Sequence, residues 1–393
     1  MRSFLALLNV AASLTLAFIL WRYLLRIPFH VSLMLIAVIS AAILIWIIRR
    51  KRVHWRYRRC EPFSGRVSVI VPAKDEEEVI RETLLSLSDQ DYGNYEVIVV
   101  NDGSVDGTED VVREFCDKYE NFKLINIPRD NEIHGKAHAI SLGFEKASGE
   151  IVGVLDADVR VPRDYLKEAL RPFSIEEISG VQTAIKGWWR RANVVSFISY
   201  YDLEFTNLFM TFFLPGRSFG TGFFMRKKDF EKAFPLEFES VSDDEQINMF
   251  IFRNHLKVVY APWVWLREHV TSDWRVLLRQ RRRWFTGMIM ESIRDKGPIG
   301  FLYSLSMILI DLAIWTIFTS PVSFPSLVLM DFVLLSALAL LIFKDDFGIE
   351  SVSKTILGTL ISYLINLAMI NYAIFKSPFF SRRDISWQRT PRV

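Results

Sequence analysis

The chain has 393 residues, of which 51% are hydrophobic and 14% aromatic, and its 48 basic and 45 acidic residues leave a formal net charge of +3. This composition excludes disordered, collagen-like and disulfide-scaffold proteins. The two cysteines are too few for a disulfide framework and fit a reducing compartment. A net charge this small gives no reason to expect nucleic-acid binding. The excess of apolar residues points instead to a lipid bilayer.

The apolar residues are concentrated near the two ends of the chain. Residues 4–25 and 29–48 are nearly uncharged, and each run is about 20 residues long, enough for a helix to cross roughly 30 Å of hydrocarbon. The first run is too long for a cleaved signal peptide and is followed at once by the second. We therefore predict two transmembrane helices in residues 1–50. Three further apolar runs lie at about 299–320, 324–343 and 354–375.

A basic segment, residues 49–59, follows the first two runs. It is interpreted as a positive-inside anchor, with a binding site for anionic lipid head groups as the alternative. Either reading places the middle of the chain in the cytosol, beneath the plasma membrane. We predict about three transmembrane or re-entrant helices in residues 299–376. Three full spans would leave the C-terminus outside, whereas the basic tail, residues 377–393, favours the inside.

Residues 62–290 between the apolar clusters have the pattern of a cytosolic α/β domain ending in interfacial helices. Strand-like and helical segments alternate, which predicts βαβ units and a mostly parallel sheet flanked by helices. The predicted elements, in chain order, are a strand at 67–73, a helix at 76–88, a strand at 95–100, a helix from about 106 to 119, a strand at 122–127, a helix at 136–147 and a strand at 151–155. This domain would be inserted between the N- and C-terminal transmembrane helices.

Polar residues follow the predicted strands, where open sheets of this kind bind ligands. Pro72 and Ala73 end the first strand, Asp102 follows the second, and Asp156 and Asp158 follow the fourth. No GxGxxG or GxxxxGK[ST] motif is present, so a dinucleotide-type Rossmann site and a P-loop ATPase are excluded. The sequence therefore predicts a ligand site of another kind at this edge.

Two carboxylates spaced i, i+2 at a strand end, Asp156 and Asp158, suit a hard cation such as Mg²⁺ or Mn²⁺ that bridges substrate phosphates. Asp102 is a second candidate, although a carboxylate before Gly103 also fits a turn cap. Lys136 opens a predicted helix, where its ammonium and the helix N-terminus would both meet a diphosphate.

A second acidic group lies further along the chain, at Asp243 and Asp244. Ser242 is a natural N-cap and acids in the first turn suit the helix dipole, which is a complete structural explanation of this group. A functional role requires a partner site, and one follows about 35 residues later. Gln280, with Arg283 and Trp284 at i+3 and i+4, would share a helix face suited to a diphosphate and a stacked sugar ring.

The alternative for this basic helix is a juxtamembrane position at the lipid interface. Long basic side chains reach toward the head groups while their stems stay in the apolar layer. We expect the remaining arginines of the segment, Arg279, Arg281 and Arg282, to lie at that interface.

The ordered set VNDGS, DAD, SDD and QRRRW, flanked by apolar runs, resembles the processive family-2 glycosyltransferases, among them the hyaluronan, chitin, cellulose and poly-N-acetylglucosamine synthases. The likeness spans about residues 67–290. The resemblance implies a GT-A fold that binds a nucleotide-diphospho-sugar. It also implies that Pro72, Ala73 and Asp102 hold the base and ribose, that Asp156 contacts the nucleotide or its diphosphate, and that Asp158, with Asp156, binds Mg²⁺ or Mn²⁺.

The same resemblance assigns the acceptor side. Asp244 would be the general base, with Asp243 as the alternative because the motif reads SDD rather than TED. Residues 219–222 resemble the glycine-bearing strand of the family, beside the acceptor. The residues expected to cap the diphosphate and contact the acceptor are Gln280, Arg283, Trp284, Gly220, Thr221 and Gly222.

The function expected from this resemblance is inverting transfer of a sugar, with UDP-N-acetylglucosamine or UDP-glucose as the commonest donors of the family, to a growing glycan at the membrane. The alternative is transfer of one sugar to a lipid such as a polyprenyl phosphate, a diacyl lipid or a ceramide-like lipid. The QRRRW motif favours the first reading, and the small number of apolar runs favours the second. A non-catalytic sugar-nucleotide sensor is disfavoured because all the acidic motifs are retained.

Overall fold

The computed structural model describes residues 55–131, 133, 135–212, 216–236 and 243–283, and isolated positions at 38, 41, 45, 48, 49, 52, 53, 354, 355, 358, 361 and 365. The five predicted membrane spans therefore lie almost entirely outside the described residues. Within the described residues, no helix is both long enough and apolar enough to cross a membrane. The predicted domain boundaries and the predicted spans stay predictions.

The first half of the described domain follows the alternation that the sequence predicts. Its elements are β1 (Val67–Ala73), α3 (Ile80–Ser88), β2 (Tyr95–Asp102), α4 (Thr108–Lys118), β3 (Phe122–Ile127), α5 (Lys136–Lys146) and β4 (Ile151–Val154). Strands β1, β2, β3 and β4 pair in parallel, in the order β3-β2-β1-β4. Parallel pairing places their carboxyl ends at one edge of the sheet, as expected.

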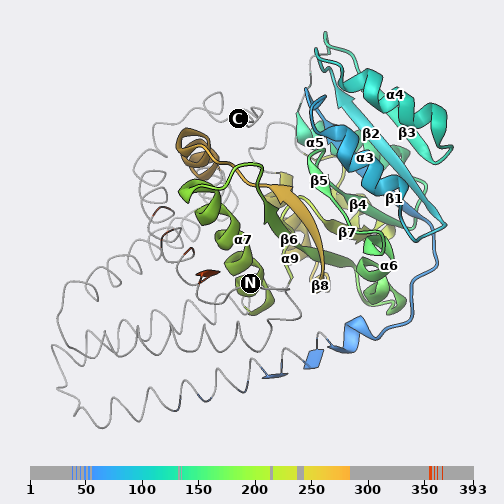
Figure 1. Cartoon of the computed structure of the whole chain (residues 1–393). Helices are drawn as coiled ribbons and strands as arrows, with labels where there is room; N and C mark the ends of the chain where they lie inside the picture. Colours follow the sequence, from blue (N-terminus) through green and yellow to red (C-terminus); the bar gives the residue numbers. More distant parts are fainter. Residues whose placement is uncertain are drawn as a thin grey trace.

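The second half continues the same sheet in a different manner. Its elements are β5 (Val159–Arg160), α6 (Tyr165–Ala169), the 3-10 turn η2 (Arg171–Ser174), β6 (Gly180–Trp188), α7 (Val194–Phe212), β7 (Phe223–Arg226), α8 (Lys227–Phe230), η3 (Glu231–Ala233), α9 (Asp243–Arg253) and β8 (Val258–His269). A further helix covers residues 274–283. The full strand order is β3-β2-β1-β4-β7-β6-β8-β5 (Figure 1).

The α/β class is confirmed, but the sheet is mixed rather than mostly parallel. Strand β7 is antiparallel to both β4 and β6, and β5 is antiparallel to β8, whereas β6 and β8 are parallel. The sheet therefore consists of a parallel half, β3-β2-β1-β4, joined through β7 to a second half, β6-β8-β5.

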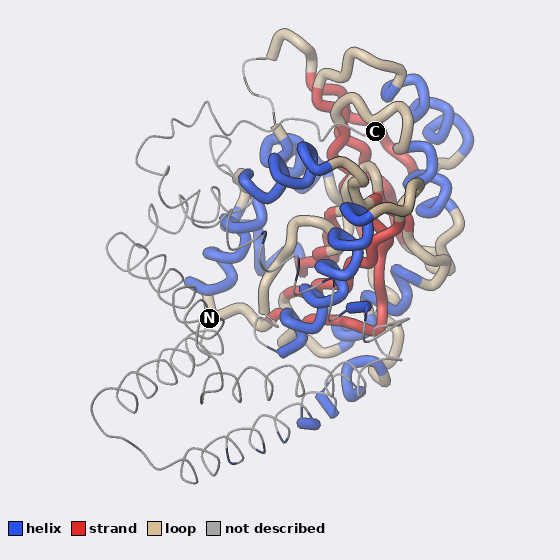
Figure 2. Tube along the Cα trace, turned by 60° about the vertical axis from the view of Figure 1, so that its left-hand side comes forward, coloured by secondary structure: helices blue, strands red, loops and turns tan. Residues whose placement is uncertain are grey.

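Helices cover both faces of the sheet, and the strands lie between them (Figure 2). On one face α3, α4 and α6 pack on alternate strand residues such as Val69 and Val99. On the other face α5 and α9 pack on the intervening residues, such as Ile70 and Ile98. Because both faces are buried, these strands are apolar almost throughout. Burying each such side chain stabilises the fold by about 1.5–3 kcal/mol.

One polar residue of α7 fixes this helix to the sheet. Asn207 accepts a hydrogen bond from the Ile185 backbone N–H at 3.1 Å and donates one to the Ile185 carbonyl at 2.8 Å. The hydroxyl of Tyr260 in β8 also donates to Asn207, at 2.7 Å. Asn207 thus satisfies backbone groups of β6 beyond the point where the pairing with β7 ends. Buried backbone groups need such partners.

Candidate functional site at the carboxyl edge of the sheet

The carboxyl ends of β1, β2 and β4 bring the first group of predicted residues together. Pro72 and Ala73 end β1 and pair with Val100 and Asn101 of β2, one step before Asp102. Asp102 is the last residue of β2, two residues beyond the predicted strand end, and its side chain is buried. The site is therefore built on strand ends rather than on a free turn.

The carboxylate of Asp102 holds the segment that precedes α5. It accepts a hydrogen bond from the Gly135 N–H at 2.8 Å and lies 3.5 Å from the Lys74 ammonium. The turn that follows β2 is capped by the neighbouring residue, Asn101. Asn101 accepts hydrogen bonds from both the N–H and the hydroxyl of Ser104.

Asp156 occupies the centre of the described site. Its carboxylate lies 2.7 Å from the ammonium of Lys136, the first residue of α5, and both side chains are partly exposed. Its backbone N–H donates to the Thr221 hydroxyl at 3.1 Å. The structure therefore brings together Lys136, Asp156 and Thr221, which belong to three separate predicted motifs.

Residues 219–222 form a turn, and the strand predicted there begins only at Phe223. Gln182 holds this turn at both ends, because its amide accepts from the Phe219 N–H at 2.8 Å and donates to the Thr221 carbonyl at 2.9 Å. The Gly222 N–H donates to the Val154 carbonyl at 2.9 Å. The prediction of a strand is wrong because Gly220 and Gly222 both adopt positive φ angles, +80° and +69°, which bend the chain.

The acidic motif downstream begins α9, as the sequence predicts. Asp243 is the first residue of the helix, and the Asp244 side chain is half-buried. One turn later, Asn248 accepts from the Ser218 N–H at 2.7 Å and donates to the Ser218 carbonyl at 3.0 Å. Residues four apart share a helix face, so Asp244 lies on the side of α9 that meets the 219–222 turn.

The side chain of Asp243 lies outside the described part of the structure. The structure therefore does not choose between Asp243 and Asp244 as the base, and this assignment stays a prediction.

Glu268, which the sequence analysis did not single out, joins the acidic end of the site. It lies in β8 opposite Val159, directly after the Asp156-Ala157-Asp158 segment. Burial, together with the negative charges of Asp158 and Asp156, raises the pKa of Glu268 to about 8, although the positive charges of Lys136 and Arg281 lower it. The local signal in the sequence is the polar triplet Arg267-Glu268-His269, which ends the otherwise apolar strand β8.

The helix at 274–283 carries the described part of the QRRRW motif. Gln280 and Arg283 are half-buried, while Arg279 and Arg282 are exposed as expected of interfacial residues. The expectation for Arg281 is wrong. Its side chain is buried and forms an ion pair with Asp202 of α7, because a buried guanidinium requires an opposite charge. Trp284 lies outside the described residues.

A bound divalent cation fits the chemistry of this edge. Burial is the largest cause of the raised pKa of Glu268, and the negative charges of Asp158 and Asp156, which a cation would neutralise, add to it. Among the described residues, no group of three or more His, Cys, Asp or Glu is arranged as a complete metal site. Mg²⁺ needs only one or two carboxylates when substrate phosphates supply further oxygens. The residue types therefore fit a metal that arrives with its substrate.

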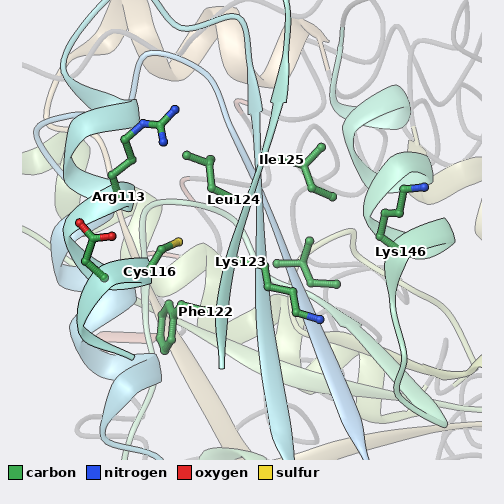
Figure 3. Close-up of a pocket in the computed structure, with 9 residues that line it drawn as sticks. Arg113, Cys116, Phe122, Lys123, Leu124, Ile125 and Lys146 are labelled. Carbon is green, nitrogen blue, oxygen red and sulfur yellow. The ribbon is translucent and has the colours of Figure 1, made fainter. Parts of the chain in front are cut away.

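A separate cavity of about 660 Å³ lies at the far side of the parallel half, along the edge strand β3 (Figure 3). It contains none of the predicted site residues. Its lining comes from β2, α4, β3 and the last turn of α5, namely Ile98, Arg113, Cys116, Asp117, Phe122, Lys123, Leu124, Ile125 and Lys146. The polar residues at the carboxyl edge therefore define the candidate site.

One segment of the chain is similar to known proteins. Residues 68–234 match the sequence profile of glycosyl transferase family 2. The probable glycosyltransferase YdaM of Bacillus subtilis is 28% identical over 235 residues, which are 56% of this chain and 55% of YdaM. The β-monoglucosyldiacylglycerol synthase of a Nostoc species is 27% identical over 234 residues, 56% of this chain and 48% of that enzyme. The chain thus spans about half the length of these relatives.

Solved structures with some likeness to the chain are also glycosyltransferases. The mannosyltransferase PcManGT of Pyrobaculum calidifontis, in complex with GDP-Man and Mn²⁺, has 20% identity and a TM-score of 0.49 over 84% of this chain and 98% of its own. TarS 1–349 of S. aureus, in complex with UDP-GlcNAc, has 16% identity and a TM-score of 0.43 over 80% and 92%. The family match lies within the segment that forms the mixed α/β sheet flanked by helices.

Proposed function

We propose that this chain is a membrane-bound, metal-dependent, inverting glycosyltransferase that moves a sugar from a nucleotide-diphospho-sugar to a glycan growing at the membrane. One observation carries the proposal. Lys136, Asp156 and Thr221 converge at the carboxyl edge of the sheet, beside the buried Asp102, within the segment that matches glycosyl transferase family 2. Open α/β sheets bind ligands at this edge.

The nucleotide and the metal would be held by residues before β5. Pro72, Ala73 and Asp102 would form the nucleotide-binding edge, and Asp102 keeps the segment before α5 in place through Gly135. Asp158 and Asp156 would hold Mg²⁺ or Mn²⁺, which neutralises a diphosphate when bound.

The ammonium of Lys136 lies at the N-terminus of α5, 2.7 Å from the carboxylate of Asp156. Together with Arg283 and Gln280, this group would stabilise the departing nucleoside diphosphate. The predicted role of Trp284, contact with the diphosphate and acceptor end, belongs to the same proposal.

The acceptor side uses α9 and the 219–222 turn. Asp244 would accept the proton from an acceptor hydroxyl, which then attacks the anomeric carbon in line with the leaving diphosphate. Asn248 ties this face of α9 to Ser218, and Gln182 ties the same turn to β6. The base and the Gly220-Thr221-Gly222 turn are therefore held in one position relative to Asp156.

A lipid acceptor is the second candidate, supported by a specific finding. A relative that is 27% identical is a β-monoglucosyldiacylglycerol synthase, whose name describes a glycolipid. Product analysis separates the two acceptors: a ladder of lengthening products from a labelled UDP-sugar indicates glycan extension, whereas one lipid-soluble product indicates single transfer.

The proposal is tested with the purified full chain and a panel of UDP-sugars, with release of UDP as the readout. Asp244→Asn should lower turnover by at least a hundredfold while leaving UDP affinity nearly unchanged, since general-base catalysis contributes about 10²–10⁴-fold. Asp158→Ala should lose both activity and its response to Mg²⁺ or Mn²⁺. Asp164→Asn, at an exposed aspartate before α6, is the matched control. Wild-type turnover by Asp244→Asn would overturn the base assignment, and metal-independent turnover would overturn the metal assignment.

A further inference from the structure

Three basic side chains lie side by side across strands β6, β8 and β5. Lys186 of β6 pairs with Arg267 of β8, and Arg267 pairs in turn with Arg160 of β5. We call Lys186, Arg267 and Arg160 the cation row. Residues that pair directly lie on the same face of a sheet, and like charges in that position destabilise it. Glu82 forms an ion pair with one member of the row, Arg160.

Aromatic rings support two members of the row. The guanidinium of Arg160 lies 4.0 Å from the centre of the Trp188 ring, and the ammonium of Lys186 lies 3.9 Å from that of Trp265. Arg190 adds a further cation, 5.9 Å from the Trp188 ring. Cation–π contacts of this kind fix the positions of the charged groups. Arg267 and Arg190 are exposed, so the row is open to a ligand from outside.

Two N–H groups in this cluster are buried and have no hydrogen-bond acceptor in the described part of the structure. They are the Nε of Arg160 and the Nε1 of Trp188. Leaving a buried donor unsatisfied costs about 1–3 kcal/mol, so such groups call for an explanation. Both groups are donors, and both lie among positive charges. The missing partner is therefore an acceptor that carries negative charge.

We propose that the cation row, with Trp188, binds a phosphate group. The guanidinium group of arginine can form two parallel hydrogen bonds to phosphate oxygens. A bound phosphate would also offset the repulsion between the positive charges of the cation row. A small movement of Arg160 away from Trp188 would expose the two unsatisfied N–H groups to the phosphate. The phosphate has two sources: the diphosphate of the nucleotide donor, since Arg160 follows Asp158 by two residues, or the head group of an anionic lipid. The nucleotide source rests on the proposed function, and the lipid source does not.

Binding experiments without turnover test this site. The full chain in neutral detergent is titrated with UDP and with short-chain phosphatidylglycerol, and diacylglycerol serves as the phosphate-free lipid. Arg267→Gln removes an exposed charge of the row, and Trp188→Phe removes one orphan N–H. Arg163→Gln, at an arginine whose side chain is 73% exposed three residues beyond Arg160, is the matched control.

The wild-type chain should bind one of the two phosphate probes, and Arg267→Gln should weaken that binding about tenfold, as loss of a charge-assisted hydrogen bond does. Trp188→Phe should weaken binding of the same probe, whereas Arg163→Gln should not weaken binding of either probe. Selective weakening of UDP identifies the donor as the source, and selective weakening of phosphatidylglycerol identifies a lipid.

Unchanged affinity for both probes in both variants overturns the proposal, as does a wild-type chain that binds neither. UDP release from the donor panel separates this result from a failure of the proposed function. A chain that binds the lipid phosphate through the row but releases no UDP contradicts only the transferase assignment.

Discussion

Replacing Glu96 by glutamine should destabilise the domain at neutral pH and remove a part of its acid sensitivity. Glu96 lies in β2 at the edge opposite the candidate site, where its carboxylate accepts hydrogen bonds from Ser68 at 2.6 Å, Lys123 at 2.7 Å, and the hydroxyl and N–H of Ser148 at 2.6 and 2.8 Å. Burial raises the pKa of Glu96, but these bonds outweigh it and lower the pKa from 4.5 to about 2.

The size of the effect follows from this difference in pKa. Each pKa unit corresponds to about 1.36 kcal/mol, so the lowered pKa of Glu96 stabilises the folded state by about 3 kcal/mol. Because the folded pKa is lower than the unfolded one, this stability is present above about pH 5 and is lost as the pH falls toward 2. The Glu96→Gln variant lacks the carboxylate, so its unfolding free energy at pH 7 should be about 3 kcal/mol lower than that of the wild type. Because residue 96 then has no group that titrates, the substitution leaves no contribution from this position to the loss of stability at acid pH.

Urea unfolding of the full chain, followed by tryptophan fluorescence from pH 7 to pH 3, measures both quantities. Glu120→Gln, at an exposed glutamate just before β3, is the control and should match the wild type throughout. Glu96→Gln should keep the wild-type affinity for UDP, since the residue lies far from the carboxyl edge. Parallel pH curves for the wild type and Glu96→Gln would refute the reasoning.

Three further predictions concern the site and its support. Asp202→Ala leaves Arg281 buried without its partner and should lower the unfolding free energy by about 3–5 kcal/mol; a loss below about 1 kcal/mol in urea unfolding contradicts this. Gly222→Ala places a Cβ 2.4 Å from the Thr183 hydroxyl at a φ of +69°, so thermal unfolding should show a loss of about 1–3 kcal/mol, and an unchanged melting temperature argues against it. The raised pKa of Glu268, about 8, means that wild-type stability falls by about 2 kcal/mol between pH 6 and pH 8 in the presence of a chelator. Glu268→Gln should be flat over that range, and an equal fall in the variant excludes this assignment.

The elements from β1 to β4 could be predicted from the sequence because their local signals agree. The strands β1, β2 and β4 are short, mostly apolar runs that end near a proline or an acidic residue, and the helices between them have a clear apolar period. Parallel pairing follows from the alternation of strands and helices, so the sequence alone predicts that Asp102 and Asp156 lie at one edge of the sheet.

Strand β8 could not be predicted from its local sequence. Pro262 lies inside it, and proline is normally absent from a central strand because it cannot donate to the ladder. The structure accommodates it with a bulge: Thr183 pairs with Ala261, but the next residue of β6, Ala184, pairs with Trp265. A local pattern does not reveal such a shift of register.

The roles of Arg281 and Glu268 depend on partners far away in the sequence. Arg281 pairs with Asp202, which is 79 residues earlier, and nothing in the run of three arginines marks which of them turns inward. Glu268 approaches Asp156 and Asp158 only because β5 pairs antiparallel with β8. Both facts come from the packing of the second half of the sheet, which has no distinctive repeat.

The junction between the two halves of the sheet has a consequence for how the protein can diverge. Four residue pairs between β4 and β7 join the halves, and Thr221 and Gly222 bond to Asp156 and Val154 across the same seam. On the proposed function, the nucleotide edge lies before the seam and the acceptor-facing turn and α9 lie after it. Selection that exchanges one specificity while conserving the other must therefore keep these contacts and the apolar core that α5 and β4 share with β7 and α9. A chimaera that joins two homologous proteins at this junction would combine the donor specificity of one with the acceptor specificity of the other.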